Sequence, residues 1–455
     1  MRVTFIQPPS SLLLEDKVMP PLGILYLAAW LRKHGHEPSV IDLAGVDAWK
    51  GELVTQRHKL SSADWIGITS TTPQYGVAKE IVRCIKEILR IDTPIVAGGI
   101  HVTSLGHANE MDFLKKDGFD SYVLGEGYNA VTRISEDIHE NRLSKMYAEP
   151  ILKDVNDLPF ASRDLIDIKS YKYKLGDVLT TTQYSQYGCI YGCVYCESPM
   201  AGSWVVRAMH PDRVAAEVKH CIDNYGIYGH MFFDDEMNLS KSRLLGICER
   251  FKCIEGLLWR GFFVSAKFDR EVAEALKGCG CFEVASGIES GSDRILRNIR
   301  KPATRSINRQ FIITAKKAGL RVKGFFIVGL PGETWESVRA TDTFLQELKD
   351  EGCAPDDVDF SILQVYPGAP VYQNPQDVEF DTEYEKAYYK SSPGSYEGLV
   401  QVRTKAMSKL DLVQARNWLE NRWKPEGWTD KHTDRKDLDQ VYESIRIAER
   451  KVIGN

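Results

Sequence analysis

Long apolar runs and clusters of basic residues are both missing from this 455-residue sequence. A stretch of about 18 consecutive apolar residues does not occur, which argues against a transmembrane helix. Lysine and arginine number 58 against 63 aspartates and glutamates, so the net charge is −5. We therefore expect no polybasic surface for nucleic acid or anionic lipid. The apolar content of 43% and charged content of 27% are typical of a soluble globular enzyme.

Cysteine is also scarce, with ten residues in the whole chain. The apolar opening, residues 3–6, is too short for a secretory signal and ends at Pro8 and Pro9. We therefore expect a cytoplasmic, reducing location and no disulfide framework. Seven of the cysteines are scattered through apolar segments and are expected to act as small buried side chains. They are Cys84, Cys221, Cys248, Cys253, Cys279, Cys281 and Cys353.

The other three cysteines lie within eight residues of one another. Cys189, Cys193 and Cys196 have the spacing C-x3-C-x2-C, and Tyr195 directly precedes the third. Three thiolates on so short a loop can bind three irons of a 4Fe–4S cluster, which leaves the fourth iron open to a substrate or cofactor. A zinc site is the alternative, but it requires a fourth ligand, and the sequence has no second C-x2-C pair. The pattern therefore favours an iron–sulfur cluster.

Residues 1–148 alternate short apolar segments with amphipathic stretches. This alternation predicts a doubly wound, Rossmann-like α/β fold with a parallel sheet, which binds ligands beyond the carboxyl ends of its strands. Glycines and hydroxyl groups in the loops at those ends would let a ligand approach closely. The predicted strands are residues 3–6, 39–41, 65–68, 94–97 and 121–124, and the predicted helices include 24–34 and 76–91.

A second strand–helix series follows an aperiodic linker at residues 149–170. Within residues 171–366 it predicts a partial (β/α)6 barrel, and the cysteine loop follows its first strand, where such a barrel places its chemistry. Residues 367–455 are expected to be mostly helical, and their tryptophans Trp418, Trp423 and Trp428 to pack in a core. The predicted strands are 178–181, 230–233, 261–264, 282–285, 322–328 and 360–365, and the predicted C-terminal helices are 409–422 and 437–451.

The cysteine loop and four later segments together resemble the radical SAM superfamily. The later segments are residues 232–236, 265–269, 287–291 and 325–334. In that family the amino and carboxylate groups of S-adenosyl-L-methionine (SAM) chelate the open iron of the cluster. The resemblance implies a SAM site made of Tyr195, Asp234, Asp235, Glu236, Lys267, Gly287, Glu289, Ser290 and Gly329.

Several of these assignments have an alternative. The carboxylates of residues 234–236 could receive the ammonium of SAM, or they could cap the helix that follows. The segment 287–291 is expected to contact the ribose and carboxylate of SAM, but its glycines also suit an ordinary turn. Residues 325–334 are expected to pack on the adenine. Lys267 stands where many relatives have arginine, and lysine lacks the planar fork that holds a carboxylate through two bonds.

The first 130 residues resemble the cobalamin-binding domain of cobalamin-dependent radical SAM enzymes. The matching segments are residues 19–28, 35–37, 66–72, 96–103 and 123–127. A D-x-H-x-x-G motif is missing, so a bound cobalamin is expected to lack a histidine ligand from that motif. His101 could approach the cofactor, although a lone histidine is more often a hydrogen-bonding loop residue. The cobalamin contacts implied by the resemblance are Pro21, Leu22, Gly23, Ser70, Thr71, Thr72, Gly98, Gly99, His101, Gly125 and Glu126.

The resemblance implies a cobalamin-dependent radical SAM methyltransferase that acts on an unactivated carbon through a deoxyadenosyl radical and methylcobalamin. Electrons would come from a donor such as flavodoxin or ferredoxin. One alternative keeps both cofactors but catalyses rearrangement, cyclisation or oxidation. Another is a radical SAM enzyme whose N-terminal domain holds no cobalamin. A methylthiotransferase is disfavoured because Cys84 is the only cysteine before the triad, and a simple iron–sulfur electron carrier because it would use four protein ligands.

Overall fold

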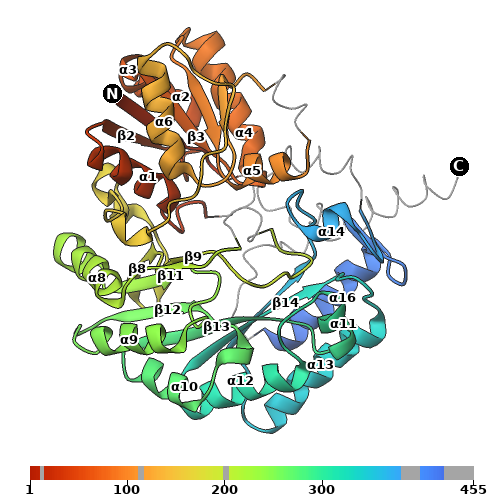
Figure 1. Cartoon of the computed structure of the whole chain (residues 1–455). Coiled ribbons are helices and arrows are strands. Elements are labelled where there is room, and N and C mark those ends of the chain that lie inside the picture. Colours follow the sequence, from red (N-terminus) through yellow and green to blue (C-terminus); the bar gives the residue numbers. More distant parts are fainter. Residues whose placement is uncertain (11–14, 111–116, 198–203, 381–399, 425–455) are drawn as a thin grey trace, which may run out of the picture.

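The structure is a computed structural model that describes residues 1–10, 15–110, 117–197, 204–380 and 400–424. Figure 1 shows two lobes, one above the other: an N-terminal lobe built on one sheet and a barrel lobe built on a second, curled sheet. Within the described residues, no helix has both the length and the apolar character needed to cross a membrane. The fold class predicted from the sequence is confirmed.

The N-terminal lobe contains six parallel strands in the order β2-β1-β3-β4-β5-β6. The five strands predicted from apolar segments are all present. The sixth was not predicted, because two residues are too few for a recognisable pattern. The strands are β1 (Arg2–Gln7), β2 (Glu37–Asp42), β3 (Trp65–Thr69), β4 (Ile95–Gly98), β5 (Ser121–Val123) and β6 (Met146–Tyr147).

Helices cover both faces of this sheet. Phe5, Trp65 and Val96 share a buried cluster with α1 and α6, whereas Ile6 and Ile66 pack with the helices of the other face, as the period of two along a strand requires. The first face is covered by α1 (Leu22–Lys33) and α6 (Gly127–His139). The other helices are α2 (Trp49–Thr55), α3 (Arg57–Ser62), α4 (Thr72–Arg83), which continues as the π-helix η1 (Cys84–Ile88), and α5 (Ile100–His107).

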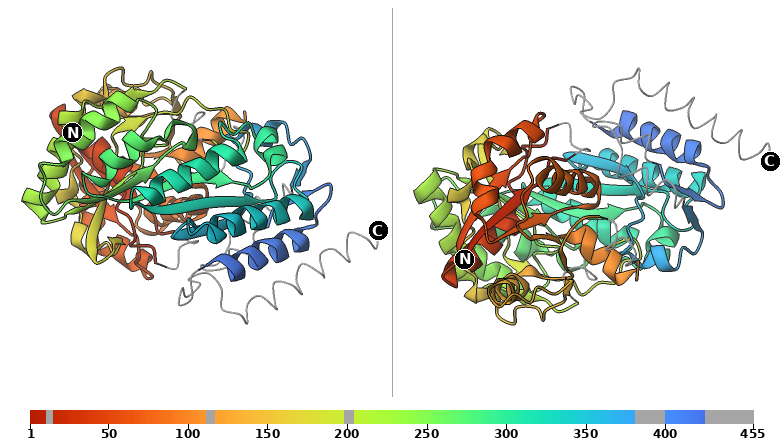
Figure 2. Two further views of the ribbon diagram at one scale, coloured as in Figure 1. Left: turned by 90° about the horizontal axis from the view of Figure 1, so that it is seen from below. Right: turned by 90° about the horizontal axis from the view of Figure 1, so that it is seen from above.

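The barrel lobe contains six parallel strands in sequence order, and the hairpin strand β7 pairs antiparallel at one edge. The sheet curls into a half-barrel whose first and last strands do not meet, and helices lie along its outer face (Figure 2). The strands are β7 (Lys174–Leu175), β8 (Val178–Gln183), β11 (Gly229–Phe232), β12 (Leu258–Phe262), β13 (Cys281–Glu289), β14 (Arg321–Val328) and β15 (Asp357–Ile362).

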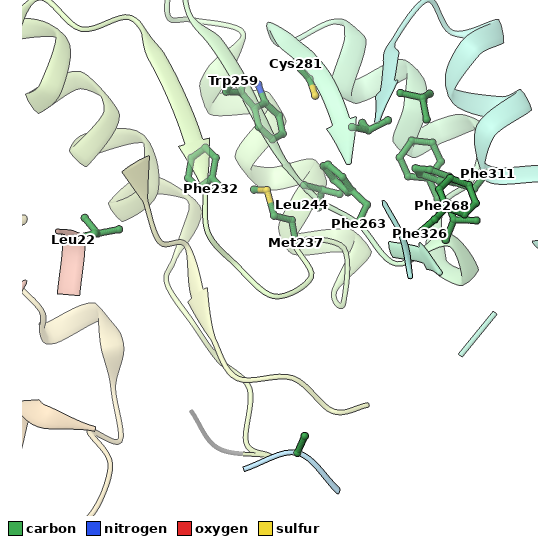
Figure 3. Packing of buried hydrophobic residues seen from close by; sticks show 14 of the residues in the cluster. Leu22, Phe232, Met237, Leu244, Trp259, Phe263, Phe268, Cys281, Phe311 and Phe326 are labelled. Atoms are coloured by element: carbon green, nitrogen blue, oxygen red, sulfur yellow. The ribbon is translucent and has the colours of Figure 1, made fainter. Parts of the chain in front are cut away.

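Aromatic side chains fill the space between the half-barrel and its outer helices (Figure 3). Trp259 meets Phe232 edge to face with ring centroids 5.7 Å apart, and Phe268 meets Phe311 in the same way at 4.7 Å. Such contacts fix the helices against the strands and hold the strand ends in place. The helices are α8 (Pro211–Tyr225), α9 (Lys241–Phe251), α10 (Arg270–Lys277), α11 (Asp293–Asn298), α12 (Arg305–Lys317), α13 (Trp335–Asp350) and α16 (Lys409–Trp423).

The remaining elements are short and lie near the sites or the C-terminal region. They are η3 (Val155–Asp157), η4 (Arg163–Leu165), η5 (Ile168–Ser170), β9 (Gln186–Tyr187), β10 (Arg207–Ala208), η6 (Ser265–Lys267), α14 (Pro370–Gln373), β16 (Val378–Phe380) and β17 (Val402–Thr404). The described part of the C-terminal region therefore includes an antiparallel strand pair as well as helices.

Two expectations about side-chain packing are wrong. Trp418 is exposed on α16 rather than packed in a core, and Cys253 is exposed rather than buried. Trp423 does pack at the edge of the core, and its indole donates a hydrogen bond to Asp342 at 2.8 Å. Trp428 and the predicted helix at 437–451 lie outside the described residues.

A buried ion pair joins the lobes. Glu217 of α8 pairs with Arg163 at 2.8 Å and with Arg213 at 3.0 Å, and it accepts a hydrogen bond from the hydroxyl of Tyr26 of α1 at 2.9 Å. Burial alone would raise the pKa of Glu217, but the two arginines hold it below its usual value. Removing one partner of such a pair costs about 3–5 kcal/mol. The predicted linker segment, which carries Arg163, therefore acts as a packed connection between the lobes.

Candidate active site

The N-terminal lobe contains a largely apolar cavity of about 260 Å³, called here the lobe cavity. It lies between the sheet and helices α1 and α6, and it reaches the carboxyl ends of β3 and β4. Five of the residues predicted to contact cobalamin line it: Gly23, Gly98, Gly99, Gly125 and Glu126. The lining also includes Tyr184 and Tyr187 of the barrel lobe, so residues of both lobes enclose the cavity.

Glycines keep the lobe cavity open. An added Cβ at Gly23 or Gly125 would meet no atom within 4 Å, and one at Gly98 would meet only Val123, at 3.8 Å. Gly99 differs, because its φ is +100° and a Cβ there would lie 2.6 Å from the carbonyl oxygen of Ser70. The backbone conformation at position 99 therefore requires glycine. Side chains at positions 23, 98 and 125 would instead enter space that a ligand could occupy.

The other predicted cobalamin contacts do not line the lobe cavity. Thr71 and Gln74 cap α4, and Pro21 and Leu22 begin α1. Ser70 is also buried away from the cavity. The hydroxyl of Thr71 therefore has a local structural role as a helix cap, which is a common use of loop hydroxyls.

His101 is completely buried on α5. Its Nδ1 lies 3.1 Å from Oγ1 of Thr72, and its ring packs on Tyr75 with centroids 4.3 Å apart. Burial lowers the pKa of His101 to about 3, so the imidazole is neutral at physiological pH. It does not line the lobe cavity, and its position agrees with the alternative of a hydrogen-bonding residue.

The barrel side of the lobe cavity is an aromatic wall. The hydroxyl groups of Tyr128 and Tyr187 lie 2.9 Å apart, and the rings of Tyr184 and Tyr187 lie 5.0 Å apart. Arg207 stacks over Tyr187 and forms a buried ion pair with Glu126 at 2.7 Å. The carboxylate of Glu126 is therefore already neutralised. The largely apolar and aromatic lining of this cavity fits an apolar part of a cobalamin.

The cysteine loop is held from two sides by backbone hydrogen bonds. The amide of Val194 donates to the carbonyl of Ile299 at 3.1 Å, and the carbonyl of Val194 accepts from the amide of Val371 at 2.8 Å. A third bond runs from the amide of Cys196 to the carbonyl of Cys193 at 3.1 Å. These contacts fix the loop beyond the carboxyl end of β8, where the sequence predicts the reactive end of the barrel.

The three thiols suit a cluster rather than a single ion. All ten cysteines fall within the described residues, and each is a free thiol. Burial raises the pKa of Cys189 to about 12 and of Cys193 to about 11, so thiolates there need the positive charge of bound iron. In the described part of the chain no three His, Cys, Asp or Glu side chains surround one metal-ion centre. A 4Fe–4S cluster does not require that arrangement, because each thiolate binds a different iron.

A second hollow, called here the barrel pocket, has a volume of about 320 Å³ and lies at the carboxyl ends of the barrel strands. Its charged side chains come from three separate loops, and Phe262 and Phe325, with centroids 5.9 Å apart, form part of an apolar wall. It is lined by Tyr195, Asp235, Glu236, Phe262, Gly287, Glu289, Lys301, Phe325, Phe326, Ile327 and Ser361.

Glu289, Tyr195 and Lys301 form a hydrogen-bonded group in the barrel pocket. Oε1 of Glu289 accepts from the hydroxyl of Tyr195 at 2.7 Å and from Nζ of Lys301 at 2.9 Å. Burial alone would lower the pKa of Lys301, but Glu289 and Glu236 raise it above its usual value, so the ammonium stays charged. A Cβ at Gly287 would lie 2.1 Å from Oε1 of Glu289. Glycine at this position therefore makes room for the group.

The backbone at Glu289 is strained. Its φ is +63°, and the pairing of β13 with β14 shifts register between Gly287 and Glu289. A non-glycine residue in this region costs about 1–3 kcal/mol, and such strain clusters at functional sites. The bulge re-aims the Glu289 side chain into the barrel pocket, as bulges beside active sites commonly do.

The three predicted carboxylates after β11 separate into two roles. Asp234 points away from the barrel pocket and accepts hydrogen bonds from the amides of Ser185 at 2.6 Å and Gln186 at 3.2 Å. Asp235 and Glu236 line the pocket. Burial raises the pKa of Glu236 to about 8, and its Oε2 has no hydrogen-bond partner among the described residues. An ammonium group entering the pocket would favour the ionised form of Glu236.

The structure does not bring Lys267, Ser290 or Gly329 to the barrel pocket. Lys267 is exposed, and its ammonium donates to the carbonyl of Leu239 at 2.9 Å. Ser290 is buried beside Thr341, and Gly329 packs near Leu412. The cation in the pocket is instead Lys301, which no sequence motif singled out. Its loop follows the short helix α11, and only the folded chain places it beside Glu289.

Comparisons with known proteins agree with this division of the chain. Residues 184–345 match the model of the radical SAM superfamily, and residues 16–135 match that of the B12-binding domain. An uncharacterised methyltransferase from Pyrococcus horikoshii is 31% identical over 399 residues, which cover 82% of this chain and 83% of that protein. An anaerobic magnesium-protoporphyrin IX monomethyl ester cyclase from Cereibacter sphaeroides is 22% identical over 396 residues, or 81% of this chain and 62% of the cyclase.

A solved structure shows the same fold. It is the radical SAM methyltransferase TsrM from Kitasatospora setae, with cobalamin and a 4Fe–4S cluster bound. It matches with a TM-score of 0.67 at 20% identity, over 82% of this chain and 74% of that one. The class defined by these lobes is an α/β enzyme with radical SAM and B12-binding domains. The chain belongs to the cobalamin-dependent radical SAM enzymes, whose cofactors are a 4Fe–4S cluster, SAM and cobalamin.

Proposed function

We propose that the protein is a methyltransferase that transfers a methyl group from SAM to an unactivated carbon of its substrate. One observation carries this proposal: a single segment of the barrel lobe lines both hollows. Tyr184 and Tyr187 line the lobe cavity, Tyr195 lines the barrel pocket, and the three cysteines lie within the same stretch. Two cofactor sites that share one short segment can act on one substrate between them. The similarity to the methyltransferase of Pyrococcus horikoshii supports this choice of reaction.

Within this proposal the barrel pocket holds SAM. Cys189, Cys193 and Cys196 would bind the cluster, and the carboxylates of Asp235 and Glu236 would receive the ammonium of SAM. Lys301 replaces Lys267 as the proposed partner of the SAM carboxylate, because it is the buried cation that lines the pocket. When bound there, the cluster would supply an electron for radical chemistry on SAM, and cobalamin would supply methyl-group chemistry.

The residues of this chain would then orient the reactants and exclude water. Phe262, Phe325 and Ile327 present apolar surface along one side of the barrel pocket. A dry, shaped wall prevents quenching of a reactive radical and keeps the reacting atoms aligned. On the other side, the tyrosines that line the lobe cavity would keep cobalamin in a fixed position.

The proposal also includes an electron donor and a reducing location. A flavodoxin or ferredoxin would reduce the cluster, since radical SAM chemistry begins with a single electron. The ten free thiols support a cytoplasmic location, where thiols remain reduced. We do not expect nucleic acid or a membrane to be a partner.

A second candidate is a radical rearrangement, cyclisation or oxidation that uses the same cofactors without methyl transfer. This second candidate is supported by the similarity to the cyclase from Cereibacter sphaeroides, which covers 81% of the chain. Both candidates use the barrel pocket in the same way. They differ only in whether the methyl group of SAM reaches the product.

Isotope labelling separates the two candidates. The anaerobically reconstituted enzyme would be supplied with SAM that carries a CD3 group and with an extract of small metabolites. A methyltransferase would form a product that contains an intact CD3 group, and would release one S-adenosylhomocysteine and one deoxyadenosine per turnover. Deoxyadenosine released over many turnovers without S-adenosylhomocysteine, while cobalamin is bound, would refute methyl transfer and support the second candidate.

A further inference from the structure

Thr103 of helix α5 is hydrogen-bonded to two residues that line the lobe cavity. Oγ1 of Thr103 donates to the carbonyl of Gly99 at 3.0 Å and accepts from the amide of Gly125 at 3.0 Å. Both glycines line the lobe cavity. One buried side chain therefore connects two of the loops that would surround a bound cobalamin.

The next residue of α5 contacts the cysteine loop. Oγ of Ser104 donates to Oε2 of Glu197 at 2.7 Å, and Glu197 directly follows the third cysteine, Cys196. Ser104 is only 1% exposed. The contact is tightly enclosed, because a Cβ at Gly368 would lie 2.9 Å from Oγ of Ser104 and 3.3 Å from Cβ of Glu197.

Other contacts hold the end of α5 against α14 of the barrel lobe. Figure 1 shows α5 at the edge of the N-terminal lobe that faces the barrel lobe, near α14. Beyond the end of α5, Glu110 accepts a hydrogen bond from the hydroxyl of Tyr372, and the carbonyl of His107 accepts from Gln373 at 3.4 Å. The Ser104–Glu197 bond is different, because it ends beside a proposed cluster ligand.

We propose that Ser104 and Glu197 are positioning residues that couple cobalamin binding to the state of the cysteine loop. Cobalamin in the lobe cavity would fix the Gly99 and Gly125 loops, Thr103 would fix α5 to them, and Ser104 would fix Glu197 and the end of the cysteine loop. A coupling between two sites is reciprocal. An assembled cluster should therefore raise the affinity for cobalamin. The inference rests on the two cofactor sites of the proposed function and does not require methyl transfer.

The test is a titration of hydroxocobalamin into the full-length protein, with and without a reconstituted cluster, followed by absorbance. We expect the native protein to bind at least about fivefold more tightly when the cluster is present, the lower end of typical couplings. Ser104→Ala and Glu197→Leu should reduce that ratio to about one while iron per chain stays unchanged. Glu197→Gln keeps a carbonyl acceptor of the same length and should retain the native ratio.

Tyr171→Phe is the matched control, because it removes the hydrogen bond from the Tyr171 hydroxyl to Asp42 of β2, at 2.8 Å, and neither residue lines either hollow. It should leave the ratio of affinities unchanged. A ratio of one in the native protein, or a native ratio in both Ser104→Ala and Glu197→Leu, would overturn the coupling and leave the proposed function intact. Failure of the native protein to bind hydroxocobalamin in either form would instead overturn the proposed function, and the coupling with it.

Discussion

The lobe cavity and the barrel pocket both reach the carboxyl ends of parallel strands, but their walls have opposite chemistry. Among the described residues, Glu126 is the only charged one that lines the lobe cavity, and Arg207 neutralises it. Three carboxylates and one ammonium line the barrel pocket. The lining of the lobe cavity therefore suits an uncharged ligand group, and that of the barrel pocket suits a charged ligand. What differs is which side chains the loops deliver, which agrees with the rule that function lies in sites built on a fold.

The largest expected effect is loss of the cluster. Cys189→Ala, Cys193→Ala or Cys196→Ala should each abolish the absorbance near 400 nm of the reconstituted protein and all SAM cleavage, because the cluster then lacks a thiolate. The lobe cavity should still bind cobalamin, although less tightly than with the cluster in place. Iron analysis and absorbance spectra provide the measurement.

Cys279→Ala is the control for this prediction, because Cys279 is buried outside both hollows. It should leave iron content unchanged. A requirement for Cys279 in cluster assembly would contradict the assignment of three ligands and an open iron.

The second-largest effect should come from removing the buried cation Lys301, and it should appear in SAM binding rather than in iron content. In Lys301→Met, the buried carboxylate of Glu289 loses its ion-pair partner. Breaking such a pair lowers the stability of the fold by about 3–5 kcal/mol. We expect a lower melting temperature and a loss of SAM affinity of at least about a hundredfold. Lys267→Met, at the exposed lysine, should change neither quantity. The reverse result would restore Lys267 as the SAM ligand.

Filling the lobe cavity should affect only the other cofactor. A Cβ at Gly98 fits without a clash, so Gly98→Val should fold, but its methyl groups would enter the cavity. We expect cobalamin affinity to fall by about tenfold or more, while the cluster absorbance stays at the native level. Equal cobalamin retention by the native chain and by a chain that begins at residue 150 would show that the cofactor does not bind in this lobe.

The smallest effect concerns the pH dependence of stability. Burial raises the pKa of Glu236 to about 8, so between the usual carboxyl range and pH 8 this residue is protonated in the folded protein and ionised in the unfolded one. Glu236 therefore makes the free energy of unfolding fall as the pH rises through that window, by at most about 1.4 kcal/mol per pH unit. Melting curves of the cluster-free protein from pH 5 to 8 should show a shallower decline for Glu236→Gln.

Glu336→Gln, an exposed residue in the first turn of α13, is the control and should keep the native slope. An identical slope in Glu236→Gln and the native protein would mean that Glu236 titrates normally, and that the barrel pocket does not isolate it from water.

Local patterns predicted most of the framework. Apart from the two-residue strands β6 and β7, the strands of both sheets were visible as short apolar segments, and the cysteine loop was visible because its three cysteines are neighbours in sequence. Gly98 and Gly99, which were predicted to contact cobalamin because they follow a strand that ends at the sheet edge, line the lobe cavity, and their contact with cobalamin stays a prediction. In each case the relevant residues lie close together along the chain.

The sequence did not indicate where side chains lie when their direction depends on distant contacts. Asp234, Asp235 and Glu236 are consecutive, and only the packing of Ser185 against Asp234 separates their roles. Lys301 reaches the barrel pocket because α11 turns the chain back beside β13, which no motif near residue 301 indicates. His101 was linked with a cofactor loop, yet its ring faces Thr72 and Tyr75 in the interior.

The tyrosines that close the lobe cavity have a consequence for any attempt to treat the two lobes as exchangeable modules. Tyr184 and Tyr187 belong to the barrel lobe by sequence, but they form a wall of the neighbouring cavity. An N-terminal lobe isolated or transplanted without them would carry a cavity with one side missing. A chimaera that exchanges cobalamin-binding lobes between two members of the family should therefore exchange this short tyrosine stretch as well, even though it lies outside the region that matches the B12-binding domain.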